Sequence, residues 1–139
     1  MEKNPEVEYE TAVVGAAYLV KGIMMRLGLK QAIDDALEYQ PLDDTTYGTL
    51  AQVLVVNRMG LQPQPLYRLK EWVIQHGMGQ VLDIDPDWLD GDRSGAMLEG
   101  LADHQVTIWS AILRKAVQHF KIDLEWLHTD TTSNKCVFR

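Results

Sequence analysis

The sequence contains very little cysteine, which excludes several kinds of protein. Cys136 is the single cysteine among 139 residues. One thiol forms neither an internal disulfide nor a cysteine-rich zinc site, so nothing here indicates an oxidising compartment. No two of the four histidines have the helical spacing of a zinc site: His76, His104, His119 and His128. The sequence therefore predicts no zinc centre.

Long uninterrupted apolar runs are also lacking. The longest apolar stretch, residues 12–29, is interrupted by Lys21 and Arg26 and contains three glycines. A membrane-spanning helix needs about 20 consecutive apolar residues, so a buried helix is the better interpretation. Residues 1–10 are acidic and lack the basic-then-apolar order of a signal peptide. We therefore expect a soluble cytoplasmic protein without a membrane partner.

Positive charge is scarce, with 13 Lys and Arg against 20 Asp and Glu and a net charge of −7. Affinity for nucleic acid comes largely from Lys and Arg that displace counterions from phosphates, so the surface as a whole does not suit DNA. Local basic groups occur around a proline-containing loop and in the last expected helix, and each could also be a solvated helix face. The DNA-binding candidates are Arg58, Arg68, Lys70, Arg114 and Lys115.

The remaining composition is that of an ordinary globular protein. Hydrophobic residues make up 46% of the chain and charged residues 24%, which excludes a wholly disordered chain. A chain of this length suits one domain with a real core. We expect an acidic flexible leader over residues 1–10, a helical domain over residues 11–122 and a strand within residues 123–139.

Apolar residues at helical spacing predict about six helices in one compact, mainly α domain. The first is expected to end at Gly28, because glycine is common just past a helix end. The others are expected at about residues 29–39, 43–60, 65–77, 95–102 and 107–120. The helix at 43–60 begins with residues typical of N-caps and is apolar nearly all round, so we expect it to be the central one.

The C-terminal part of the sequence alternates as a strand does. Leu124, Trp126 and His128 fall on one side, with Glu125, Leu127 and Thr129 on the other. A strand needs a neighbour for its backbone N–H and C=O groups, and no other segment resembles a strand. Either it pairs with another copy, or it packs imperfectly, or its partner strands lie in sequence that is absent.

Aspartates at positions 83, 85 and 87 follow the beginning of a calcium-loop pattern. Trp88 stands where the pattern needs glycine, and Ser94 stands where it needs a bidentate glutamate. The better interpretation is a solvated loop that leads into a helix. Either Asp90 or Asp92 is expected to cap that helix, with Arg93 balancing the local negative charge.

Four blocks of sequence carry a resemblance to a known family. They are LGLKQAIDDAL (27–37), PLYRLKEWV (65–73), LDGDRSGAMLEGL (89–101) and WLHTDTTS (126–133). The chain resembles, from residue 11 to residue 133, the N-terminal region of prokaryotic insertion-sequence transposases of the DDE type. In that group a helical domain precedes an RNase H-like catalytic core. The resemblance implies a role in DNA transposition, and a C-terminal strand that is the first strand of the core.

The resemblance also implies a catalytic role for Asp130. The matching acid is the first of an Asp-Asp-Glu triad that holds Mg²⁺ for DNA strand transfer. From the residues alone, Asp130 equally fits a turn. The second Asp and the Glu are missing from this sequence, and Ala96 and Glu99 stand where the family commonly has Arg and Asp near the motif of Asp90, Asp92 and Arg93. The expectation is a truncated fragment that is inactive by itself and has no cofactor of its own.

Two functions compete at this point. The helical domain either binds transposon-end DNA or supports assembly of a transposase. Alternatively, it is a free-standing helical module that self-associates through its C-terminal strand and does not bind DNA. An enzyme acting on a small molecule has no supporting motif in the sequence.

Overall fold

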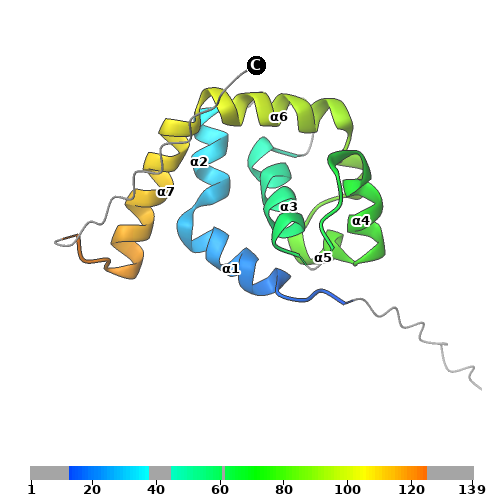
Figure 1. The fold of residues 1–139 in the computed structure, drawn as a ribbon, viewed down its shortest axis with the longest axis horizontal. Coiled ribbons are helices and arrows are strands. Elements are labelled where there is room, and N and C mark those ends of the chain that lie inside the picture. The colour runs from blue at the N-terminus through cyan, green and yellow to red at the C-terminus, as the bar shows by residue number, and fades with distance from the viewer. Residues whose placement is uncertain (1–12, 38–44, 61, 125–139) are drawn as a thin grey trace, which may run out of the picture.

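The computed structural model describes residues 13–37, 45–60 and 62–124. Over these ranges the chain forms seven α-helices and two 3₁₀ turns, with no strand among them (Figure 1). The prediction of a mainly α fold is therefore confirmed. The predicted C-terminal strand falls almost wholly on residues 125–139, which lie outside the described ranges, as does the leader of residues 1–10.

The helices match the sequence pattern with two main differences. Their bounds are α1 Ala17–Leu27, α2 Leu29–Ala36, α3 Tyr47–Met59, α4 Leu69–Gln75, α5 Met78–Leu82, α6 Gly91–Asp103 and α7 Gln105–Phe120, with 3₁₀ turns η1 at Leu66–Arg68 and η2 at Pro86–Trp88. The short α5 was not predicted, because five residues are too few for apolar periodicity to appear. The other difference is that α6 begins four residues earlier than expected.

Helix α3 is the centre of the fold, as its sequence predicts. Figure 1 shows α1 and α2 on one side of α3, α4 and α5 on the other, and α6 running across one end. Helix α7 lies at the outer edge of the bundle and packs against α1 and α2. Val53 of α3 is fully buried, and Leu50 and Val56 are nearly so. A helix that is apolar around most of its circumference has to be covered on several sides.

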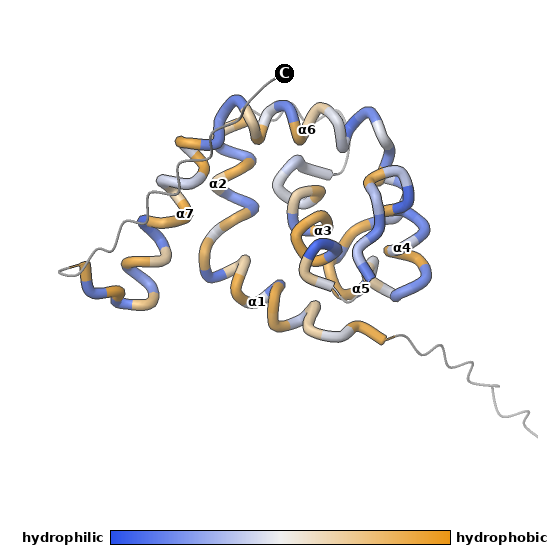
Figure 2. Tube along the Cα trace, viewed as in Figure 1, coloured by the Kyte–Doolittle hydropathy of each residue, from blue (hydrophilic) through white to orange (hydrophobic). Residues whose placement is uncertain are grey.

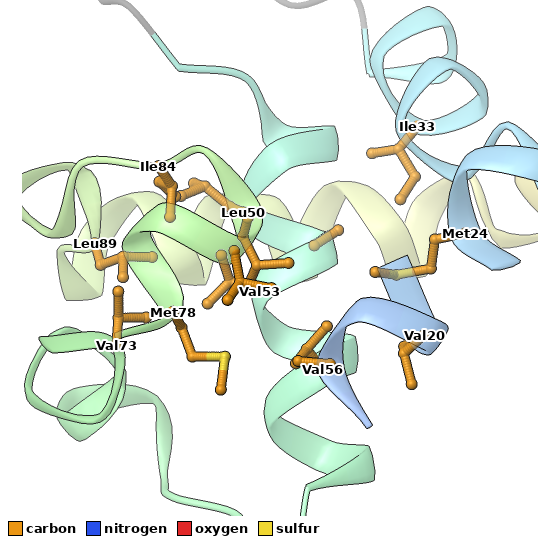
Figure 3. Close-up of a cluster of buried hydrophobic side chains, with 14 of the residues drawn as sticks. Val20, Met24, Ile33, Leu50, Val53, Val56, Val73, Met78, Ile84 and Leu89 are labelled. Carbon is orange, nitrogen blue, oxygen red and sulfur yellow. The ribbon is translucent and has the colours of Figure 1, made fainter. Parts of the chain in front are cut away.

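The core brings together apolar side chains from most of the helices (Figure 3). Burial of such side chains is the main stabilising contribution to a fold of this kind, at roughly 25 cal/mol for each Å² of apolar surface removed from water. Figure 2 shows that apolar residues alternate with polar ones along the helices. The labelled side chains are Val20 and Met24 from α1, Ile33 from α2, Leu50, Val53 and Val56 from α3, and Val73, Met78, Ile84 and Leu89 from the segments that follow.

The contact between α2 and α3 depends on a glycine. Gly48 lies in the first turn of α3, and its backbone N–H donates to the Asp34 carboxylate of α2 at 2.7 Å. A Cβ atom at Gly48 would lie against the Lys30 carbonyl oxygen and 2.8 Å from Lys30 Cγ. The two helices therefore touch at the level of their backbones. Just before, Thr46 caps α3 by accepting a hydrogen bond from the Thr49 N–H at 3.2 Å, as the cap-type residues predict.

One polar side chain, Asn57 of α3, is completely buried. Its amide is oriented to pair with the backbone of Gln64 twice. The Asn57 Nδ2 donates to the Gln64 carbonyl at 2.9 Å, and the Asn57 Oδ1 accepts from the Gln64 N–H at 3.1 Å. This pairing attaches the segment before η1 to the central helix and satisfies polar groups that would otherwise be costly to bury.

Candidate nucleic-acid interface

A polar groove of about 480 Å³ is the best candidate for a functional site. Its walls come from α1, α2, α3, α7 and the end of α5. Three lysines from three different helices line it: Lys21 of α1, Lys30 of α2 and Lys115 of α7. Asp83 contributes the acidic side chain of the lining. The groove therefore has an excess of positive charge in a chain whose net charge is −7.

Lys21 is held in place at one wall of the groove. Its Nζ donates to the carbonyl oxygen of Val81, in the last turn of α5, at 2.7 Å. The side chain is half-buried, so its direction is set by the surrounding helices. An ammonium group has three N–H donors, and one hydrogen bond leaves donors for an anion in the groove.

Lys115 reaches the groove across Gly28. Gly28 joins α1 to α2 in the left-handed conformation, with φ 62° and ψ 34°, and its N–H donates to the carbonyls that end α1. The predicted helix break at Gly28 is thus confirmed. A Cβ atom at this position would lie 2.8 Å from Lys115 Cδ. The backbone conformation therefore favours glycine here, and a larger residue would also displace the flexible end of the Lys115 side chain.

We expect Gly28→Ala and Gly15→Ala to destabilise the protein by similar amounts. Both glycines have positive φ, 62° and 51°, so both alanines carry the backbone cost of about 1 kcal/mol. At Gly28 the new methyl would also meet the Lys115 side chain, but only its flexible end, which can move aside at little cost, and nothing lies within 4 Å at Gly15. Urea unfolding should therefore show a loss of about 1 kcal/mol for each variant. A much larger loss for Gly28→Ala would contradict this account and show that the Lys115 side chain is held rigidly.

Of the five predicted DNA-binding residues, the structure places Lys115 in the groove. Arg114 precedes it on α7 and is exposed, but does not line the groove. Lys21 and Lys30 were missed by sequence reasoning. The sequence features that could have selected these two lysines were weak: Lys21 interrupts an apolar helix, and Lys30 follows the break at Gly28. Neither signal shows that the three lysines converge.

The other basic candidates lie elsewhere. Arg58 is exposed in the last turn of α3. The Arg68 guanidinium lies 5.7 Å from the centre of the Tyr67 ring. Lys70 Nζ pairs with Asp87 Oδ1 at 2.7 Å, and the hydrogen bond and charge of Asp87 raise the pKa of Lys70. Lys70 is therefore already engaged by a local carboxylate.

The motif of Asp90, Asp92 and Arg93 begins helix α6. The Asp90 carboxylate accepts from the Arg93 N–H at 2.7 Å and pairs with Arg93 Nε at 3.1 Å. The hydroxyl of Ser94 donates to the Asp90 carbonyl at 2.8 Å. Asp92 lies in the first turn, where a negative charge favours the helix. The expected capping role is confirmed for Asp90, and this cap explains why α6 starts at Gly91.

Two aspartates of the calcium-like pattern, Asp85 and Asp87, make local hydrogen bonds and ion pairs. Asp85 accepts from the Asp87 N–H at 2.9 Å, and Asp87 pairs with Lys70. Across the residues that the structure describes, no three His, Cys, Asp or Glu side chains gather as a metal site would require. Asp130, to which the resemblance assigns Mg²⁺, lies outside those residues.

The chain belongs to the family described as a domain of unknown function, DUF4277, whose model matches residues 9–113. The matched residues include Lys21 and Lys30, whereas Lys115 and Asp130 follow them. Neither the curated proteins nor the solved structures contain a significant match. Among the described residues, no helix combines the length and apolar character needed to cross a membrane.

Proposed function

We propose that this helical domain contacts DNA as part of a transposase-like protein of the DDE type, and that the groove of Lys21, Lys30 and Lys115 holds backbone phosphates. The observation that carries the proposal is the convergence of three lysines from three helices on one groove. The resemblance of four sequence blocks to insertion-sequence transposases supplies the kind of ligand. The proposal assigns no catalytic step to the described residues.

The acidic net charge does not oppose this proposal strongly. At physiological ionic strength the Debye length is about 8 Å, so exposed charges farther away than that act only weakly on a bound phosphate. The groove lining contains three ammonium groups and one carboxylate, so the nearby charges favour an anion. Ammonium groups also suit phosphates as compact point charges, without demanding a fixed geometry. Binding of this kind positions a DNA backbone and carries little sequence information.

We expect the protein to bind a mixed-sequence 30-base-pair duplex weakly and with clear salt dependence. Three phosphate contacts predict a slope of about −2.7 in a plot of log affinity against log salt, or about a 40-fold loss between 50 and 200 mM salt. In Lys30→Ala/Lys115→Ala the slope should fall to about −1, with affinity reduced about tenfold at low salt. Fluorescence anisotropy of a labelled duplex measures both quantities.

A matched control separates the groove from net charge. The variant Arg58→Ala/Lys70→Ala removes the same number of positive charges at positions outside the groove. It should bind DNA with nearly the affinity and salt slope of the unmodified protein. Equal losses in the two double variants would show that net charge, and not the groove, governs binding. No binding at low salt would overturn the proposal and favour an interaction module without DNA.

A further inference from the structure

Helix α7 has two apolar faces, and the part of the chain that the structure describes covers only one of them. Ile108 and Ile112 are buried where α7 packs against α1 and α2. Helix α7 itself lies at the outer edge of the bundle (Figure 1), and its second apolar face is here called the α7 stripe. Its side chains are exposed by 75%, 60%, 56% and 47% at Val106, Trp109, Leu113 and Phe120, with half-buried Ala116 completing the set.

The spacing of the α7 stripe is that of a helix-pairing seam. Its five residues follow one another at intervals of three, four, three and four, the a and d positions of a heptad. The stripe spans about 21 Å along the helix, at 1.5 Å per residue. A strict a/d stripe is narrower than the apolar face with which a helix usually joins a globular core. This pattern indicates that the partner is another helix.

We propose that the α7 stripe pairs with the α7 stripe of a second copy of this chain. The positions on either side of the stripe carry no fixed charge, being Gln105, Ser110, Ile112, Val117 and His119. Two such stripes meet without like-charge repulsion, although each chain carries −7 overall. A two-fold symmetric interface joins the same patch on both copies, so the patch has to be self-complementary, and an uncharged apolar stripe meets that condition.

An antiparallel arrangement fits the side chains best. In antiparallel pairing an a position of one helix faces a d position of the other, so Trp109 faces Leu113 or Phe120 of the second copy and not its own equivalent. The small Ala116 then lies opposite a larger apolar side chain, Val106 or Leu113. The two helix dipoles also oppose each other favourably in this orientation.

The pairing surface is separate from the groove. Helical geometry places Arg114 and Lys115 away from the α7 stripe, and Lys115 lines the groove between the helices. A dimer formed through the stripe therefore leaves both grooves accessible. Stable complexes bury about 800 Å² per partner, and five side chains cover less than this. We therefore expect association at micromolar concentrations, not an obligate dimer.

Sedimentation velocity of the full chain over a range of concentrations tests the proposal. The mass should rise from 15.8 kDa toward twice that value as concentration increases. Leu113→Glu should weaken association about 100-fold or more, because a two-fold interface contains the substitution twice. Ile74→Glu is the matched control: Ile74 of α4 has the same 56% exposure as Leu113 but lies outside the stripe. It should dimerise like the unmodified protein.

Two controls distinguish loss of the interface from loss of folding. Circular dichroism should show equal helix content in all variants. If Leu113→Glu proves unstable, Trp109→Gln should also dissociate the dimer. Added salt should maintain or strengthen association, since it screens the repulsion between two acidic chains, whereas it weakens DNA binding. A monomer at every concentration, including one whose α7 stripe is covered by its own residues 125–139, would overturn the proposal. Equal dissociation by Ile74→Glu would also overturn it.

Discussion

Gly48→Ala is expected to lower the free energy of unfolding by about 2–3 kcal/mol, because the contact between α2 and α3 has no room for a methyl group. The new Cβ would meet the Lys30 carbonyl oxygen and lie 2.8 Å from both Lys30 Cγ and the Asp34 Oδ1 atom. A carbonyl oxygen belongs to the backbone of α2, so the helices would have to move apart. The shift would also lengthen the hydrogen bond from the Gly48 N–H to Asp34.

Thermal unfolding followed by circular dichroism measures this effect. For a domain of this size, the loss corresponds to a decrease in Tm of about 10 °C. Gly22 of α1 and Gly95 of α6 supply the controls, because nothing lies within 4 Å of a Cβ at either position. Alanine should stabilise these two helices by up to about 1 kcal/mol. If Gly48→Ala were as stable as Gly22→Ala, this result would contradict the close backbone contact between α2 and α3.

Asn57→Leu is expected to cost about 3 kcal/mol, the second large effect. Leucine has a similar volume but no amide, so it leaves the N–H and C=O of Gln64 without the partners that Asn57 provides. Each polar group buried without a hydrogen bond costs about 1–3 kcal/mol. Because Asn57 is fully buried, water cannot take the place of its side chain amide without opening the core.

Urea unfolding and amide hydrogen exchange test the role of Asn57 together. Global stability should fall, and the Gln64 amide should exchange faster than amides elsewhere in the core. Gln80→Leu in α5 is the control, since Gln80 is exposed and the substitution should change stability by less than about 0.5 kcal/mol. Unchanged protection of the Gln64 amide in Asn57→Leu would contradict the paired arrangement.

Much of the fold follows from local sequence. Periodic apolar residues predicted the longer helices, Gly28 predicted the break between α1 and α2, and Asp90 was one of two predicted caps for α6. Each of these signals acts over a few residues. Helix α5 escaped prediction because it is only five residues long and is held by packing and not by its own periodicity.

The candidate site was far less predictable. Lys115 was selected from a local basic group, whereas Lys21 and Lys30 were not, and Lys70 proved to be engaged by Asp87. Local sequence reports which residues are charged but not which charges become neighbours. The α7 stripe shows the same difference, since its spacing is visible in the sequence but its exposure is known only from the packing of α7.

The sequence by itself determined the helical class, the central position of α3 and the break between α1 and α2 at Gly28, because these depend on apolar spacing and on a glycine within a few residues. Tertiary structure alone decided that Lys21, Lys30 and Lys115 share a groove, that Gly48 brings two backbones into contact and that the described residues leave one apolar face of α7 uncovered. These features join segments far apart in the chain. Their positions depend on the packing of whole helices, which no local pattern encodes.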